Sequence, residues 1–215
     1  MAGLEDWLSV ARTADPDELR ERILTGFKEG KPFTPYVPTI TIPAPLDRVL
    51  DFGCGVGRSF PYLKSIARHV TGFDLPPMIE RCRTLAGESI DALSADWNDV
   101  CTQRFGLINA ALVLQHIEPS PCRAYLRDFA RMSRFVYLLS RDQDDFGWNV
   151  FEHVAQTGLF EAGDCIEVEH DPATHQLRVI RRITFDDARR RADGKHYEVL
   201  LRSRAAPDDL QLTSR

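Results

Sequence analysis

Three acidic residues and a cluster of glycines occupy the middle of the chain at a spacing suited to ligand recognition. Asp51 stands two residues ahead of the segment GCGVG, residues 53–57. Clustered glycines let a ligand approach the backbone closely, and a carboxylate ahead of them repels a phosphate but attracts an ammonium group. Asp74 follows at the distance, about twenty residues, where an acid can bind both hydroxyls of a ribose. Asp96 could accept a hydrogen bond from an exocyclic amine.

The glycine spacing distinguishes this ligand from a dinucleotide. A dinucleotide-binding loop has the pattern G-x-G-x-x-G, whereas residues 53–57 have the pattern G-x-G-x-G with an acid ahead of it. Trp97, next to Asp96, offers an aromatic ring that could cover a base. A cation, a ribose and an adenine, recognised by three successive segments, describe S-adenosyl-L-methionine better than NAD.

Alternating apolar and helical patterns predict how these residues are positioned. Five apolar runs are separated by segments of helical spacing, which is typical of βαβ units in a mostly parallel sheet. After Gly158, two β-rich runs separated by a turn at residues 171–172, and a further run, predict antiparallel strands at the sheet edge. Ligands bind at the carboxyl ends of strands in such sheets, so we expect the acids there. The first five expected strands are 47–53, 69–75, 89–97, 105–114 and 133–141.

The N-terminal part of the chain differs from this pattern. Residues 1–30 have helical spacing, with Asp15 as a helix cap, and five of the fifteen residues 31–45 are proline. We therefore expect residues 1–45 to form a helical segment and connector that closes over the site as a lid. Residues 46–204 would be the catalytic domain, and residues 205–215 a flexible tail.

Composition narrows the classes of partner and compartment. The 215 residues carry a formal net charge of −5, which argues against a nucleic-acid partner. Five cysteines without a CxxC pair argue against a disulfide framework and a zinc site, so we expect no metal and a reducing cytoplasm. The N-terminus lacks the apolar core of a signal peptide, and no run of about 18 apolar residues predicts a membrane span.

Four motifs in order resemble those of the class I S-adenosylmethionine-dependent methyltransferases of the small-molecule type. "VLDFGCGVGR" is similar to the nucleotide loop of that family, and "VTGFDLPPMIERCR", "LSADW" and "FGLINAALVLQHI" resemble its next three motifs. The resemblance covers residues 47–141 and departs at Gly106, where many relatives carry an acid. It implies a Rossmann-like α/β fold with a seven-stranded, mostly parallel sheet and an antiparallel edge hairpin. It also implies S-adenosyl-L-methionine as cofactor and S-adenosyl-L-homocysteine as product.

The resemblance also assigns roles to individual residues. His116 would be a general base or a substrate contact, although it could equally pack or bond to the backbone. Asp74 and Asp96 have an alternative role as caps, and Trp97 could belong to the core. Candidate substrate residues are chosen by position: Tyr36 in the expected lid, and Arg141 and Trp148 in the acid-rich segment 140–148, which could instead be a solvated loop. The cofactor-binding residues implied are Asp51, Gly53, Cys54, Gly55, Gly57, Asp74, Leu75, Asp96, Trp97, Ala111, Leu112 and Gln115.

The expected reaction is methyl transfer to an oxygen or nitrogen of a small molecule or of a sugar- or lipid-linked metabolite. A protein or RNA methyltransferase is the alternative within the same chemistry, weakened because "LQHIEP" stands where an Asn-Pro-Pro-Tyr type of signature would be. A non-catalytic module of the same fold and a nicotinamide-dependent oxidoreductase are alternatives of another class. Intact Asp51, Gly55 and Asp74 disfavour the former, and the glycine spacing disfavours the latter.

Overall fold

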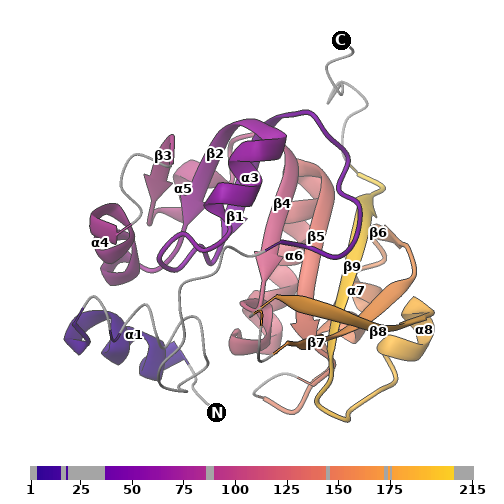
Figure 1. The fold of residues 1–215 in the computed structure, drawn as a ribbon. Coiled ribbons are helices and arrows are strands. Elements are labelled where there is room, and N and C mark those ends of the chain that lie inside the picture. Colours follow the sequence, from indigo (N-terminus) through magenta and orange to yellow (C-terminus); the bar gives the residue numbers. More distant parts are fainter. Residues whose placement is uncertain are drawn as a thin grey trace.

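One mixed sheet organises the chain (Figure 1). The computed structural model describes residues 4–15, 18, 37–85, 90–143, 146–171, 174 and 176–205. Within these residues the sheet has nine strands in the order β3-β2-β1-β4-β5-β9-β7-β8, and β6 pairs with β9. The strands are β1 Leu46–Phe52, β2 Ala67–Phe73, β3 Ala92–Ser94, β4 Phe105–Ala111, β5 Ser133–Arg141, β6 Phe160–Ala162, β7 Cys165–His170, β8 Leu177–Ile183 and β9 His196–Ser203.

The predicted change from parallel to antiparallel pairing is confirmed. β1 to β5 pair in parallel, and β9 runs antiparallel to β5 and β7. The chain moves outward from β1 to β2 and β3 and then returns to place β4 on the other side of β1. This reversal puts the expected ligand site at the carboxyl ends of β1 and β4.

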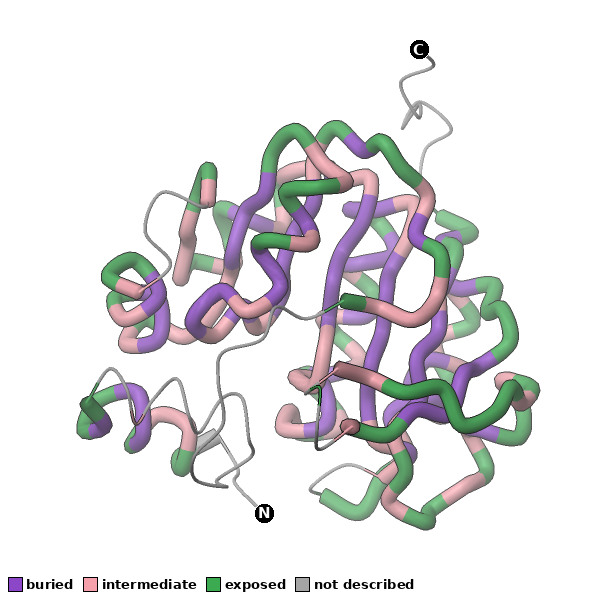
Figure 2. Tube along the Cα trace, in the orientation of Figure 1, coloured by how far each residue is buried: buried purple, intermediate pink, exposed green. Residues whose placement is uncertain are grey.

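Helices cover both faces of the sheet, with α3 on one face and α6 and α7 on the other (Figure 1). Figure 2 shows the buried residues concentrated along the central strands. Phe60 and Leu63 of α3 pack with Ile42 of the connector, and Phe129 of α6 packs with Phe151 of α7. The helices are α1 Leu4–Thr13, α3 Phe60–Ile66, α4 Pro76–Leu85, α5 Trp97–Val100, α6 Pro119–Met132, α7 Val150–Thr157, α8 Phe185–Ala188 and the 3₁₀ helix η2 Leu114–His116.

The predicted fold class is confirmed, but the number of strands differs. The resemblance implies seven strands, and the structure describes nine. The eight runs expected from the sequence all form strands, and the three-residue strand β6, which pairs with β9, was not expected. The third strand covers only Ala92–Ser94 rather than residues 89–97. Its end is set by Asp96, whose carboxylate accepts the N–H of Asn98 at 2.9 Å and begins α5.

Parts of the N- and C-terminal predictions lie outside the described residues. These parts are residues 1–3, 16–17 and 19–36, which include Tyr36, and the tail from residue 206. Asp15 does accept the N–H of Glu18 at 2.9 Å, as expected for its capping role. No helix in the described parts of the chain is long and apolar enough to cross a membrane.

Candidate active site

The carboxyl group of Asp51 lies at the end of β1 and is 2% exposed. The register of β1 and β4 places Asp51 opposite Asn109, whose Nδ2 donates to Oδ1 at 2.6 Å. The other oxygen, Oδ2, is buried and has no hydrogen-bond partner among the described residues. Burial raises the pKa of Asp51 to about 7, and the nearby charge of Asp74 adds to the rise against the effect of Asn109. A buried carboxyl oxygen in this state favours a cationic donor.

The glycine loop follows directly and requires glycine for two reasons. Gly53, Gly55 and Gly57 have φ angles of 73°, 55° and 86°, which other residues rarely adopt. A side chain on Gly53 would also overlap Val113 beyond β4, because an added Cβ would lie 2.7 Å from the Cβ of Val113. The loop thus brings its backbone close to the end of β4. Cys54, between Gly53 and Gly55, is buried.

Asp74 joins the end of β2 to the glycine loop. Its carboxylate accepts the N–H of Gly55 at 2.7 Å and that of Leu75 at 2.7 Å, just ahead of α4. Burial raises the pKa of Asp74 to about 6, although both backbone hydrogen bonds act in the opposite direction. Asp74 therefore fixes the loop geometry, and its carboxylate lies in the same part of the fold as that of Asp51.

Asp96 and Trp97 occupy different surroundings. Asp96 is exposed and uses Oδ1 to cap α5. The ring of Trp97 contacts four aromatic rings of the α6 side, including Phe52 at 5.5 Å between centroids, and its Nε1 donates to Asp128 at 3.0 Å. The geometry thus gives Trp97 a packing role and leaves Asp96 as the residue of this pair that faces solvent.

The end of β4 is connected to β5 through backbone and side-chain contacts. Leu112 has a φ of 60°, which is uncommon for a residue with a side chain, and its N–H donates to the carbonyl of Leu139 at 2.8 Å. Gln115 in η2 is buried, and its Oε1 accepts the N–H of Arg141 at 3.0 Å. Gln115 therefore fixes η2, and with it His116, against the end of β5.

The N-terminal helix α1 lies over the glycine loop. Its residues Val10 and Ala11 belong to a cluster with Val56 of the loop and Met78 of α4, and Figure 1 shows α1 beside α4. The ring of Trp7 lies 5.9 Å from that of His116, edge to face. α1 thus contacts both the glycine loop and the predicted catalytic histidine.

The structure describes two of the predicted substrate residues, Arg141 and Trp148, whereas Tyr36 lies outside the described residues. Arg141 ends β5 and is partly buried, next to the segment that carries His116. Trp148 is 45% exposed and stacks on His153 of α7 at 5.3 Å. Arg141 thus contacts the segment that follows β4.

Two buried polar residues in apolar strands escaped the sequence reasoning. Asn109 holds Asp51, as described above. Glu198 of β9 is completely buried and accepts the N–H of Thr39 at 3.0 Å and the hydroxyl of Tyr137 at 2.5 Å, as well as the hydroxyl of Thr39. Glu198 thereby attaches the connector to the sheet. The signal in the sequence that could have identified them is a polar residue within an apolar run: Asn109 in "FGLINAALVL" and Glu198 in "HYEVLL".

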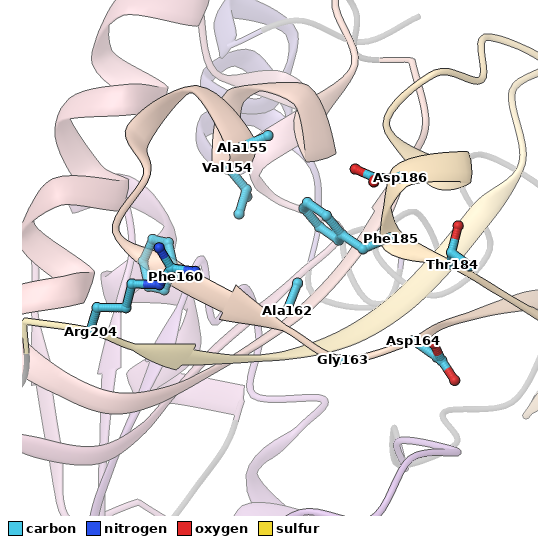
Figure 3. Close-up of a pocket in the computed structure, with 10 residues that line it drawn as sticks. All are labelled: Val154, Ala155, Phe160, Ala162, Gly163, Asp164, Thr184, Phe185, Asp186 and Arg204. Carbon is cyan, nitrogen blue, oxygen red and sulfur yellow. The ribbon is translucent and has the colours of Figure 1, made fainter.

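An open hollow of about 580 Å³ lies elsewhere, toward the amino end of β5 (Figure 3). It is lined by α7, β6 and α8, and by Arg204 beyond β9. Because β6 pairs with the last residues of β9, this hollow is at the opposite end of the sheet from the glycine loop. It contains none of the predicted site residues and is not part of the candidate active site.

Comparisons with known proteins agree with this geometry. Residues 49–134 match the family model described as "Methyltransferase domain". The N-methyltransferase NodS from Bradyrhizobium japonicum WM9, in complex with S-adenosyl-l-homocysteine, is similar in structure, with a TM-score of 0.52 and 16% identity over 74% of this chain and 79% of that chain. Another NodS structure from that organism has a TM-score of 0.50 and 16% sequence identity, over 74% of this chain and 87% of that chain. No curated protein sequence matches the chain significantly.

The matched segment runs from β1 to the start of β5 and includes Asp51, the glycine loop, Asp74 and the end of β4. The structural similarity to the NodS proteins covers 74% of this chain and therefore extends beyond the matched segment. The family model and the fold thus point to the same conclusion. Residues 49–134 match a methyltransferase domain, and the described fold is similar to that of an N-methyltransferase.

Proposed function

We propose that the chain binds S-adenosyl-L-methionine and methylates an oxygen or nitrogen atom of a small molecule. The observation that carries the proposal is the buried Oδ2 of Asp51, which has no hydrogen-bond partner among the described residues. The α-ammonium group of the cofactor is a donor of the right charge for this oxygen. A phosphate of a nicotinamide dinucleotide would instead be repelled by the carboxylate.

Three acids would hold the cofactor along the carboxyl ends of β1, β2 and β3. Asp51 would bind the ammonium, Asp74 the ribose hydroxyls and Asp96 the adenine amine, using its solvent-facing oxygen. The positive-φ glycines keep side chains out of the path of the ligand. When bound, S-adenosyl-L-methionine supplies an electrophilic methyl carbon, so the reaction is a direct displacement.

The protein contributes alignment and control of protons. Holding both reactants in a fixed geometry can supply about 7–11 kcal/mol of the barrier. His116 would accept the proton of a nucleophile that arrives protonated, and Gln115 would keep η2 in place by its hydrogen bond to the backbone of Arg141. Trp7 of α1 would limit the access of water to His116.

The N-terminal segment supports a small acceptor rather than a polymer. α1 packs on the glycine loop, and Thr39 of the connector is bound by Glu198 of β9. We propose that residues 1–45 are a lid over the catalytic domain of residues 46–204. A lid attached on both sides leaves a narrower entrance than a polymer needs.

Calorimetry of the full chain with S-adenosyl-L-homocysteine and with NADH tests the proposal. We expect the former to bind and the latter not to bind. Asp74→Ala should weaken S-adenosyl-L-homocysteine by about 10- to 100-fold, since it removes a charged acceptor worth roughly 1.5–3 kcal/mol. Asp47→Ala, which removes an exposed acid at the start of β1, is the control and should change nothing. NADH binding alone, or unchanged affinity in a folded Asp74→Ala protein, would overturn the proposal.

A further inference from the structure

Four basic side chains lie at the same edge of the sheet, beyond the end of β4. They come from four separate elements: Arg58 follows the glycine loop, Arg141 ends β5, His170 ends β7 and His196 begins β9. β9 is antiparallel to both β5 and β7. The end of β5, the end of β7 and the start of β9 therefore lie at one edge. We call these four residues the basic cluster.

Hydrogen-bond distances and strand register bring the members of the basic cluster together. The Nη2 of Arg58 lies 3.2 Å from the Nε2 of His170. Arg141 and His196 are directly opposite in the β5–β9 register, so their side chains stand on the same face of the sheet. His196 is also opposite Val168, which packs with α3. The basic cluster thus lies on the face of the sheet that α3 covers. Arg58 belongs to the same face, because it lies shortly before the start of α3.

His196 lies close enough to the other basic side chains to be influenced by their charges. Burial and, to a smaller extent, the positive charges of Arg141, His170 and Lys195 lower the pKa of His196 to about 4. His196 is therefore neutral at pH 7 and can act as a donor or an acceptor, while the two arginines remain charged.

Two buried carboxylates that are close in sequence to Arg141 and His196 bind backbone and hydroxyl groups. Asp142 accepts the N–H groups of Asp193 and Gly194 at 3.2 and 2.9 Å and so fixes the turn ahead of His196. Glu198 accepts from Thr39 and Tyr137. Both acids thus hold backbone and connector in place around the basic cluster.

We propose that the methyl acceptor carries an anionic group, a carboxylate or a phosphate, which is bound by Arg58 and Arg141. A planar guanidinium can bind either group through two parallel hydrogen bonds. His196 would add a neutral contact. This inference rests on the proposed function, because it assigns the acceptor to the half of the site that the cofactor acids leave open. The net charge of −5 disfavours a nucleic acid as the source of the phosphate.

The test uses the full chain saturated with S-adenosyl-L-homocysteine and three probes: inorganic phosphate, benzoate and benzamide. Benzamide matches benzoate in shape but has no charge. We expect at least one anion to bind at least tenfold more tightly than benzamide in calorimetry. A preference for benzoate or for phosphate then identifies the acceptor group as carboxylate or phosphate.

Substitutions test whether the anion binds at the basic cluster. Arg141→Gln and Arg58→Gln should each weaken the preferred anion about tenfold or more. Arg182→Gln is the control and should leave the affinity for this anion unchanged. Arg182 lies in β8, and its side chain is 72% exposed. Equal affinity for benzoate and benzamide without phosphate binding, or unchanged anion affinity in folded Arg141→Gln, would overturn the inference. Failure of the wild type to bind S-adenosyl-L-homocysteine would instead overturn the proposed function.

Discussion

The two halves of the carboxyl edge of the sheet are built in opposite ways. The cofactor half, at β1 to β3, has carboxylates and a glycine loop, and Asp51 and Asp74 lie within one βαβ unit. The acceptor half, at β5, β9 and β7, has arginines and histidines that lie far apart in the sequence and meet only through antiparallel pairing. The acidic half suits a cationic cofactor, and the basic half suits an anionic acceptor. We propose that this edge binds two ligands of opposite charge side by side.

The halves also differ in what fixes their shape. Backbone geometry fixes the cofactor half, since three glycines have positive φ and Asp74 bonds directly to the N–H of Gly55. Buried carboxylates fix the acceptor half, through Asp142 at the turn and Glu198 at the connector. Changes to glycines should thus affect the cofactor, and changes to these acids should affect the acceptor.

The largest effect is expected from Gly53→Ala. The substitution forces a side chain into a φ of 73° and against Val113, so the loop must move away from the end of β4. Strain of this kind costs about 1–3 kcal/mol before the overlap is counted. We expect S-adenosyl-L-homocysteine to bind at least about 100-fold more weakly in calorimetry.

Gly147→Ala separates the two causes of the expected loss, which are backbone strain at a positive φ and overlap with a neighbouring side chain. Gly147 has a φ of 82° but nothing within 4 Å of an added Cβ. The substitution of Gly147 by alanine should lower the free energy of unfolding by about 1 kcal/mol and leave the affinity for S-adenosyl-L-homocysteine unchanged. If Gly53→Ala bound S-adenosyl-L-homocysteine as the wild type does, the close approach of the loop to β4 would not matter for binding.

A smaller and more selective effect is expected from Glu198→Gln. The amide places an N–H₂ group where Thr39 and Tyr137 donate, so one donor loses its acceptor. We expect the free energy of unfolding in urea to fall by about 1–3 kcal/mol, anion binding to weaken, and S-adenosyl-L-homocysteine affinity to change less than about threefold.

Glu161→Gln is the matched control, because Glu161 is exposed on β6. It should leave stability and both affinities unchanged. A loss of cofactor affinity in Glu198→Gln as large as the loss of anion binding would show that the two halves are not separable.

The same comparison explains what the sequence could predict. The glycine loop and its acids are local in sequence, so their positions at the ends of β1 and β2 followed from pattern alone. Asn109 was missed because only the β1–β4 register reveals that it faces Asp51. The basic cluster was missed because His170 and His196 meet through strand pairing. The side on which Trp97 packs depends on where β3 ends, and β3 was predicted too long.

Protonation of Asp51 links the cofactor half to pH. Its pKa in the folded protein is raised to about 7 from an ordinary value of 3.8. The folded state therefore binds the proton more strongly, and this carboxyl lowers the stability of the unliganded protein as pH rises from about 4 to 7. Asp51→Asn removes that charge and keeps an acceptor for Asn109. At pH 8 it should fold at least as stably as the wild type.

The pH dependence of S-adenosyl-L-homocysteine affinity, measured by calorimetry from pH 5.5 to 8, tests the central claim most directly. Only the ionised carboxylate of Asp51 neutralises the bound ammonium, so the wild-type affinity should rise by up to about tenfold per pH unit and level off above pH 7. The Asp51→Asn protein should bind S-adenosyl-L-homocysteine more weakly than the wild type. Its affinity should rise with pH only below about pH 6, where Asp74 ionises. A flat wild-type profile, or equal affinities of wild type and Asp51→Asn at pH 8, would contradict the account.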